Sequence, residues 1–279
     1  MTDNKRVLTF FASDGRLFFL IPMGPKTCIG TTDTQVEDPE VGVTPQDRQF
    51  VLDNVNALLD LDEPLVPENV IAERVGVRPL AMQGEGGAAD WVQLSRKHVI
   101  EQSEHHRHLT IFGGKLTDCL NVGDEVVDKV ADMGVIIPYP ENRWYGEPSS
   151  SQRDEFMLQA RLMNLDALTD SSSSEPLSER FWRRYGTSAF GLLERIREDE
   201  SVAALLIENA EYTRCEIELA ARLEMIVKLE DFMRRRSKIE QVVKREAIVS
   251  APGLREACQI LFGEDADERL EEYLTATAK

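Results

Sequence analysis

A pair of glycines followed by a lysine stands where an apolar run ends, in HLTIFGGKLTDC (residues 108–119). Glycine has no Cβ, so backbone N–H groups at Gly113 and Gly114 can approach a ligand closely, and a helix start beyond them favours an electron-rich group. Asp118 would repel a phosphate, so a polarised carbonyl edge fits this turn better. The alternative is a plain tight turn with Asp118 as the helix cap and Lys115 in solvent.

Two arginines could bind a phosphate or carboxylate in the forked manner of a guanidinium: Arg78 in RVGVRPL and Arg96 in QLSRKH. In a strand, Val75 and Val77 share one face and Arg78 lies on the other. Pro79 then imposes extended backbone on Arg78 and gives it a stiff base. The alternative for each arginine is an exposed position on an edge strand.

The histidines and the arginine run give weaker signals. His98 shares a strand face with Arg96, by the period of two. The segment EHHRH (104–108) falls in an expected hairpin turn that would not converge its rings on a metal, so we expect a solvated loop. The arginines of FMRRRS (232–237) fan outward on a helix, which favours ion pairs with glutamates over an anion site.

The first half of the chain reads as strands around one helix. Apolar runs that meet at Asp14-Gly15 predict a hairpin, and KTCIGTTDTQV predicts a third strand. Thr44 and Pro45 predict the start of a helix over residues 44–60. Further strands are expected in VIAERVGVRPLAM, DWVQLSRKHVIEQS and HLTIFGG, and a helix is expected in LTDCLNVGDEVVDKVADM.

A linker composition divides the chain. Residues 138–151 are rich in Pro, Gly, Ser and Asn, and beyond them the segments read as short amphipathic helices, the first capped by Ser178. Residues 171–174, four serines, predict a solvated loop. We therefore expect an α+β fold: a domain over residues 1–137 built on a mostly antiparallel sheet, the linker, and an all-helical domain over residues 152–279.

Composition excludes several classes of protein. The 279 residues carry 32 Lys+Arg against 50 Asp+Glu, a net charge of −18, which disfavours nucleic acids and anionic lipid surfaces as partners. The four cysteines form no CxxC pair, so neither zinc nor a disulfide framework is indicated, and a cytoplasmic location fits best. No apolar run approaches the ~20 residues that span a bilayer.

Four motifs, in this order and at this spacing, resemble one family: IPMGPKTCIGTTDT, RVGVRPL, LSRKH and IFGGKLTD. Residues 18–130 resemble the C-terminal portion of the FAD-dependent, quinone-linked (aerobic) glycerol-3-phosphate dehydrogenases. The helical half, most visibly AEYTRCEIELAARLEMIVKLEDFMRRRSKI, is similar to the C-terminal helical domain of that family. The resemblance implies that the sheet domain is a substrate cap with one flavin-contacting strand, turn and helix.

The resemblance also assigns roles to residues. It implies that Arg78 and Arg96 reach glycerol 3-phosphate and that Lys115 lies beside it, which makes Lys115 and Arg78 the candidate catalytic residues. The residues implied to line the flavin ring of FAD are Gly113, Gly114, Lys115, Leu116 and Thr117. In the complete enzyme, hydride transfer from C2 of the substrate to FAD would give dihydroxyacetone phosphate, and quinone would take the electrons.

Two departures from the family limit this assignment. Where members continue GGKLT with Thr or Gly and then Tyr-Arg, this chain reads Asp118-Cys119-Leu120, so no role of that tyrosine and arginine carries over. The GxGxxG segment that holds the ADP half of FAD in the family has no counterpart here. We therefore expect a fragment that lacks its N-terminal FAD-binding partner, carries no FAD and is inactive alone.

Alternatives stay open at this stage. The chain could belong to another flavin oxidase of the same superfamily that acts on an amino or hydroxy acid, although two arginines favour a phosphate. It could also be a non-catalytic interaction module. A homo-oligomer and a peripheral contact at the inner face of the cell membrane are compatible with the sequence, which decides neither.

Overall fold

The structure, a computed structural model, describes residues 6–77, 98–103, 107–139 and 146–276. The chain forms two compact units. The larger unit comprises Met1–Gln35, Gly42–Arg74 and Gly146–Lys279, and the smaller one, called the hairpin unit below, comprises Val36–Val41 and Val75–Tyr145. The boundaries of these units differ from those of the domains expected at 1–137 and 152–279. That each expected domain folds independently stays a prediction.

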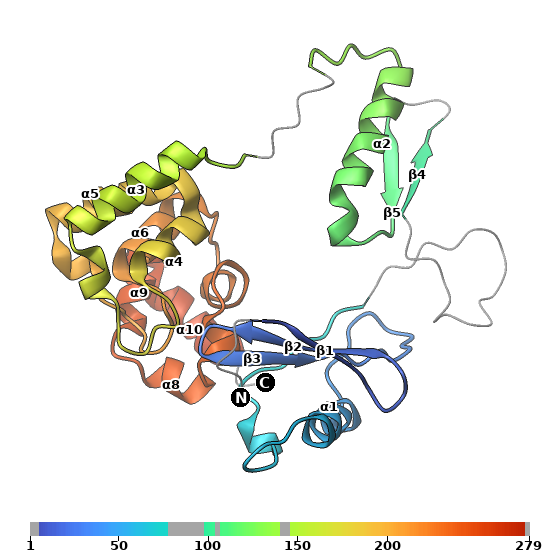
Figure 1. The fold of residues 1–279 in the computed structure, drawn as a ribbon, viewed down its shortest axis with the longest axis horizontal. Coiled ribbons are helices and arrows are strands. Elements are labelled where there is room, and N and C mark those ends of the chain that lie inside the picture. Colours follow the sequence, from blue (N-terminus) through green and yellow to red (C-terminus); the bar gives the residue numbers. More distant parts are fainter. Residues whose placement is uncertain (1–5, 78–97, 104–106, 140–145, 277–279) are drawn as a thin grey trace. The chain divides into compact units, whose positions relative to one another are not determined.

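The larger unit begins with a three-stranded antiparallel sheet in the order β1 (Leu8–Phe11), β2 (Leu17–Met23), β3 (Lys26–Gly30). Figure 1 shows the strands side by side. The expected hairpin is confirmed, and its turn holds Gly15 at φ +83°, a conformation that favours glycine. The third strand forms only the first part of the predicted segment KTCIGTTDTQV, because it ends at Gly30.

Helix α1 (Pro45–Leu58) packs against this sheet as predicted from Thr44. The Thr44 side chain accepts a hydrogen bond from the Asp47 amide, and the Asp47 carboxylate accepts one from the Thr44 amide, which forms a capping box. Phe18 and Leu20, two residues apart on β2, point into one core with Val55 of α1. The sheet and helix are thus joined by an apolar face.

After residue 149 the larger unit is helical, as expected for this part of the chain. The helix over Ser150–Leu162 was not predicted individually, and one predicted helix start is wrong. Ser178 is not the cap of its helix, which begins one residue earlier; instead it is buried and bonds Asp166. The α-helices are α3 (Ser150–Leu162), α4 (Leu177–Tyr185), α5 (Ala189–Glu198), α6 (Arg214–Leu223), α7 (Ile239–Val242), α8 (Arg245–Ser250), α9 (Leu254–Phe262) and α10 (Ala266–Ala276).

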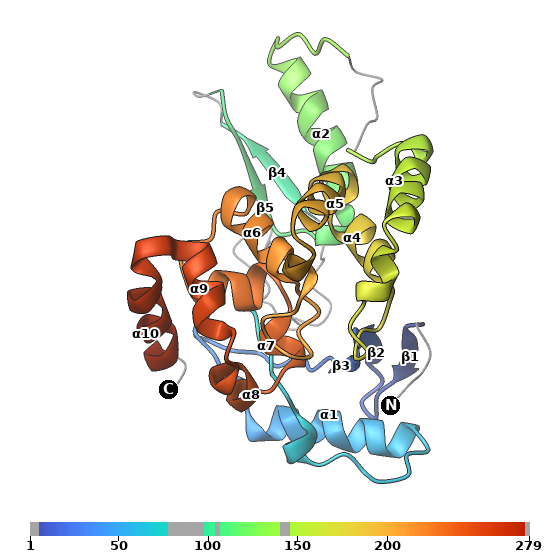
Figure 2. The same ribbon diagram turned by 90° about the vertical axis from the view of Figure 1, so that its left-hand side faces the viewer.

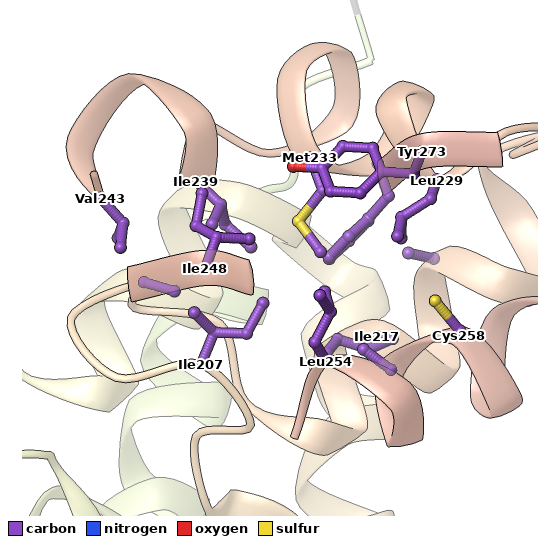
Figure 3. Packing of buried hydrophobic residues seen from close by; sticks show 14 of the residues in the cluster. Ile207, Ile217, Leu229, Met233, Ile239, Val243, Ile248, Leu254, Cys258 and Tyr273 are labelled. Carbon is purple, nitrogen blue, oxygen red and sulfur yellow. The ribbon is translucent and has the colours of Figure 1, made fainter. Parts of the chain in front are cut away.

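Two apolar clusters hold these helices together. One, around Phe156 and Phe181, joins α3, α4 and α5. The other lies under α9 and α10, which run side by side (Figure 2), and its closely packed members are seen in Figure 3. Its labelled residues are Ile207, Ile217, Leu229, Met233, Ile239, Val243, Ile248, Leu254, Cys258 and Tyr273.

The segment LEDFMRRRSKIEQV does not form the single amphipathic helix that its pattern predicted. It forms a π-helix, η7 (Asp231–Arg236), followed by the short helix α7. The break falls at Ser237, whose buried hydroxyl donates to the Phe232 carbonyl at 2.6 Å. A serine that bonds backbone within a helix competes with the regular ladder, which accounts for the interruption.

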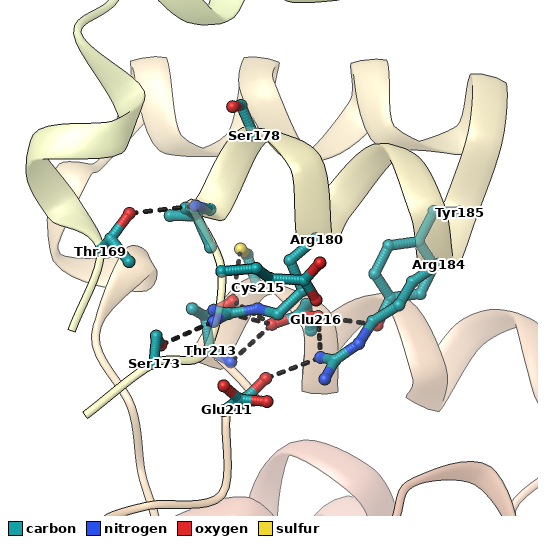
Figure 4. Close-up of polar contacts among 12 residues, drawn as sticks. Thr169, Ser173, Ser178, Arg180, Arg184, Tyr185, Glu211, Thr213, Cys215 and Glu216 are labelled. Carbon is teal, nitrogen blue, oxygen red and sulfur yellow. Dashed lines mark hydrogen bonds and ion pairs between the residues drawn. The ribbon is translucent and has the colours of Figure 1, made fainter. Parts of the chain in front are cut away.

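A buried carboxylate, Glu216 at the start of α6, organises the polar interior of the helical part (Figure 4). One of its oxygens accepts from Arg184 at 2.7 Å and from the Tyr185 hydroxyl at 3.1 Å. The other accepts from the amide and the hydroxyl of Thr213, at 2.8 and 3.0 Å, which caps the helix. Burial alone would lower the pKa of Arg184, but Glu216, Tyr212 and Tyr185 together outweigh burial, so that pKa is raised.

The serine run 171–174 forms a loop, as expected, with Ser171 and Ser174 exposed, and it also supplies hydrogen bonds to this interior. The Ser173 hydroxyl accepts a hydrogen bond from Arg180, a side chain that is fully buried. Ser174 donates from its amide, at 2.6 Å, to Glu211. The loop therefore supplies polar partners to two charged groups that the fold removes from water.

The sheet is joined to the helical part at the turn between β2 and β3. Met23 packs against the cluster under α9 and α10, and Gly24 lies so close to Glu211 that an added Cβ would stand 3.0 Å from its carboxylate. Lys244 reaches the carbonyl of Glu68 at 3.1 Å. These contacts make the sheet, α1 and the helices one unit.

The hairpin unit consists of β4 (Val99–Gln102), β5 (Leu109–Phe112) and α2 (Cys119–Asp132), with α2 beside the two antiparallel strands (Figure 1). These elements confirm the strands expected around HVIEQ and HLTIF and the helix expected after the glycines. The strand expected in VIAERVGVRPLAM is wrong over residues 70–77, which form no strand. Its remainder lies outside the described residues.

Packing predicts opposite outcomes for two glycines in the helical part. A Cβ on Gly253 would stand 2.0 Å from the carbonyl oxygen of Leu206, so Gly253→Ala should lower the free energy of unfolding by about 1–3 kcal/mol. A Cβ on Gly191, within α5, would meet nothing within 4 Å, so Gly191→Ala should raise it by about 0.5–1 kcal/mol. Urea unfolding followed by circular dichroism measures both; equal stabilities would contradict this packing.

The Glu216 cluster predicts a difference between two glutamates of one helix. Glu216→Ala should cost about 3–5 kcal/mol of stability, because it leaves Arg184 buried without its carboxylate. Glu218, two residues on, forms a partly exposed pair with Arg195, so Glu218→Ala should change stability by less than about 1 kcal/mol. Thermal unfolding of the two variants compares them, and a similar loss in both would show that the buried cluster carries no special weight.

Candidate functional site

The turn Gly113–Thr117 joins β5 to α2. Gly113 adopts φ +65° and Gly114 φ +92°, so both glycines hold conformations that other residues rarely adopt. Lys115 then returns to extended backbone, and a single 3₁₀ turn, η3 (Leu116–Asp118), leads into α2. Two glycines are therefore needed at this point because the backbone of the turn takes positive φ angles at both positions.

The side chains that follow the glycines face solvent within the hairpin unit. Lys115 and Thr117 are exposed, and Leu116 is 91% exposed. An apolar side chain exposed to this degree beside a lysine and a bare glycine backbone forms a surface with both apolar and cationic character. Such a surface can contact a flat, partly apolar ring that carries polarised carbonyl groups.

Asp118 occupies the N-cap position of α2 without capping it. Its carboxylate makes no bond to the helix amides, and instead accepts from Asn121 at 2.6 Å and pairs with His98 at 3.0 Å. The interpretation of Asp118 as a plain helix cap is therefore wrong. Asn121 first and His98 second hold the pKa of Asp118 below its ordinary value.

His98 lies between two carboxylates and is only 5% exposed. Its Nδ1 is 3.0 Å from Asp118 and its Nε2 is 2.8 Å from Glu125. Glu125, and to a lesser extent Asp118, raise the pKa of His98 above 6.5. His98 also packs against the turn through its Cβ, since a Cβ on Gly114 would stand 3.1 Å from that atom.

The sequence pattern indicates for His98 only that it shares a strand face with Arg96. It does not predict that His98 pairs with Asp118 and Glu125. A signal was available in the spacing of its partners. Asp118 and Glu125 are seven residues apart, two helical turns, so they project from the same side of α2. Two acids on the helix face that meets a strand histidine predict such a bridge.

The two phosphate candidates, Arg78 and Arg96, lie outside the described residues, so their approach to Lys115 stays a prediction. Arg74, which the strand pattern placed on the face of Arg78, belongs to the larger unit and donates to the Cys28 sulfur at 3.1 Å. The site residues that the structure does bring together are those of the turn, with His98 beneath them.

The other charged segments behave largely as expected. In FMRRRS, Arg235 pairs with Glu230 and Asp231, both at 3.1 Å, and Arg236 donates to the Glu224 carbonyl, which confirms ion pairing for Arg235. Of EHHRH, only the exposed Arg107 and His108 are described. Within the described ranges, no group of three or more His, Cys, Asp or Glu side chains could hold a metal ion.

None of the described helices combines the length and the hydropathy needed to cross a lipid bilayer.

Comparison with known proteins agrees with this architecture. Residues 153–269, the helical part, match the family model of the C-terminal domain of alpha-glycerophosphate oxidase. The mitochondrial glycerol-3-phosphate dehydrogenase of Arabidopsis thaliana is 25% identical over 266 residues, a match that covers 90% of this chain and 40% of the relative. This match therefore extends beyond the helical part into the strands.

Two further relatives are more similar over shorter stretches. The aerobic glycerol-3-phosphate dehydrogenase of Bacillus subtilis is 34% identical over 132 residues, 46% of this chain and 22% of the relative. The mitochondrial enzyme of Mesocricetus auratus is 33% identical over 117 residues, 42% of this chain and 16% of the relative. The matched part of the chain thus spans less than half the length of these relatives. Together the matches confirm the resemblance: this chain is similar to the C-terminal portion of the glycerol-3-phosphate dehydrogenases, including the aerobic bacterial enzymes.

Proposed function

We propose that this chain supplies the substrate-contacting and flavin-contacting segments of a flavoprotein that oxidises glycerol 3-phosphate to dihydroxyacetone phosphate. The relatives are named for this substrate. The observation that carries the proposal is the Gly113–Thr117 turn, whose two positive-φ glycines bring bare backbone, an exposed Lys115 and an exposed Leu116 to one surface. Quinone is the proposed electron acceptor.

The turn fits the flavin of FAD. Gly113 presents backbone without a side chain, and Leu116 offers an apolar contact for a ring. We assign Gly113, Gly114, Lys115, Leu116 and Thr117 as the residues that would hold the ring, with N–H groups toward its pyrimidine carbonyls. When bound, FAD supplies the two-electron acceptor; the chain's own part is to orient it and stabilise charge on that edge.

Binding of the phosphate group of the substrate requires positively charged side chains, although the chain as a whole is acidic. With a net charge of −18, a phosphate dianion binds only where positive groups gather locally. Arg78 and Arg96 are the proposed phosphate clamp, since forked guanidinium contacts fix both the charge and the orientation of the substrate. Lys115 is the proposed base that takes the proton of the C2 hydroxyl.

The cofactor assignment can be tested by colour. We expect the purified 279-residue chain to lack the flavin band near ~450 nm, because it contains no GxGxxG segment for the ADP half of FAD. Coexpression with a FAD-binding segment that carries GxGxxG should give a yellow complex. A flavin band in the chain alone would contradict the half-site proposal, and a colourless complex would count against any flavin role.

The catalytic assignment predicts a kinetic difference between two lysines of the hairpin unit. In the full-length flavoprotein, Lys115→Met should slow flavin reduction by glycerol 3-phosphate by about 10²–10⁴-fold, the usual contribution of a general base. Lys129→Met, on the last turn of α2, is the matched control and should leave the rate unchanged. Stopped-flow absorbance measures both variants. Reduction by D-alanine or D-lactate in place of glycerol 3-phosphate would instead favour an amino-acid or hydroxy-acid oxidase.

A further inference from the structure

The side chain beneath the turn, His98, is a charged bridge without an assigned role. It is nearly enclosed, with 5% of its side chain exposed, and each of its ring nitrogens meets a different carboxylate. A neutral imidazole carries one N–H and one lone pair, so it can donate to only one of Asp118 and Glu125. Only the imidazolium donates to both. The geometry therefore favours the protonated ring.

We propose that His98 is a positioning residue for the Gly113–Thr117 turn, and that its imidazolium fixes the turn by bonding Asp118 and Glu125 at once. His98 immediately precedes β4, Asp118 ends the 3₁₀ turn that follows Lys115, and Glu125 lies two helical turns along α2. One ring thus ties the strand side of the hairpin unit to the helix side. The backbone between them packs against the Cβ and backbone of His98 at Gly114.

A contact between His98 and Gly114 connects this bridge directly to the turn. A Cβ at Gly114 would stand 3.1 Å from the His98 Cβ and 3.7 Å from its Cα, so the glycine packs directly on the histidine. Gly114 also needs its φ of +92°. The backbone of the turn beside Lys115 therefore packs on the Cα and Cβ of the residue whose ring bonds the two carboxylates.

The bridge also bears on the charge of Asp118 at the start of α2. Alone, this carboxylate would oppose an electron-rich ligand at the turn. The charged groups that face the imidazole among the described residues are Asp118 and Glu125, and Lys115 acts on Asp118 in turn. With His98 protonated, the positive charges of His98 and Lys115 both act on Asp118, and that of His98 also acts on Glu125.

The dependence on pH follows from the direction of the shift. Because the carboxylates raise the pKa of His98 above 6.5, folding favours the protonated ring. The stabilisation is fully present below pH 6.5 and is lost as the pH rises through the raised pKa. The turn should therefore be better fixed in mildly acidic than in alkaline solution.

Measurement in the unmodified chain comes first. Titration of His98 by NMR should give a pKa above 6.5. Asp118→Asn and Glu125→Gln should each lower the His98 value, since each removes one acceptor. A His98 pKa at or below 6.5 in the unmodified chain would overturn the proposal without any question of folding.

The effect on the turn is read by hydrogen exchange of residues 113–118. At pH 6, His98→Gln should speed exchange of these amides by at least about tenfold, a loss of about 1.4 kcal/mol. At pH 9 the difference between variant and unmodified chain should shrink, because neutral histidine has one N–H and cannot donate to both carboxylates. A purely packing role would give the same difference at both pH values. His108→Gln is the control and should change neither.

The link from the His98 bridge to catalysis rests on the proposed function. One measurement distinguishes failure of the bridge from failure of the proposed function. In the full-length flavoprotein, His98→Gln should raise KM for glycerol 3-phosphate or lower kcat at pH 6 more than at pH 9. Altered hydrogen exchange with unchanged kinetics would uphold the bridge and remove the turn from the flavin site. Unaltered exchange would overturn the bridge and leave the proposed function standing.

Discussion

Each unit of this chain removes an ionisable side chain from water and surrounds it with opposite charge. In the helical part the group is Glu216, held by Arg184, Tyr185 and Thr213. In the hairpin unit it is His98, held by Asp118 and Glu125. Because a buried charge without partners costs several kcal/mol, the segments that supply the partners must hold their places. Loops with little apolar packing thereby acquire defined positions.

The two bridges differ in what can disturb them. The Glu216 cluster joins a carboxylate to guanidinium and hydroxyl groups, none of which changes charge near neutral pH. The His98 bridge contains the one side chain type whose charge ordinarily changes between pH 5 and 8. The helical part is thus a fixed scaffold, and the turn that carries Lys115 is held by a bond that responds to solution conditions. Its apolar surroundings are also slight, since the described residues of the hairpin unit other than His98 are at least partly exposed.

Local sequence signals predicted the elements well and their ends less well. Thr44 with Pro45, Asp14-Gly15 and Gly113-Gly114 each marked a real boundary, because capping and positive-φ requirements act over a few residues. Ser178 was misread because its hydroxyl found a tertiary partner, Asp166, twelve residues away. The strand expected before Arg78 failed for a related reason. Alternation of apolar residues shows that a segment can pair, but not that a neighbouring strand exists.

The site was predictable where its chemistry is local and not where it depends on pairing across elements. Gly113 and Gly114 identify the turn by residue type alone. The residue type of His98 does not by itself indicate a role. The two carboxylates that it contacts, Asp118 and Glu125, lie two helical turns apart and explain why the ring is charged. A substitution that is acidic at position 118 would look damaging to an anion-facing turn if taken alone. It becomes compatible with the turn because His98 pairs with it and carries the compensating proton.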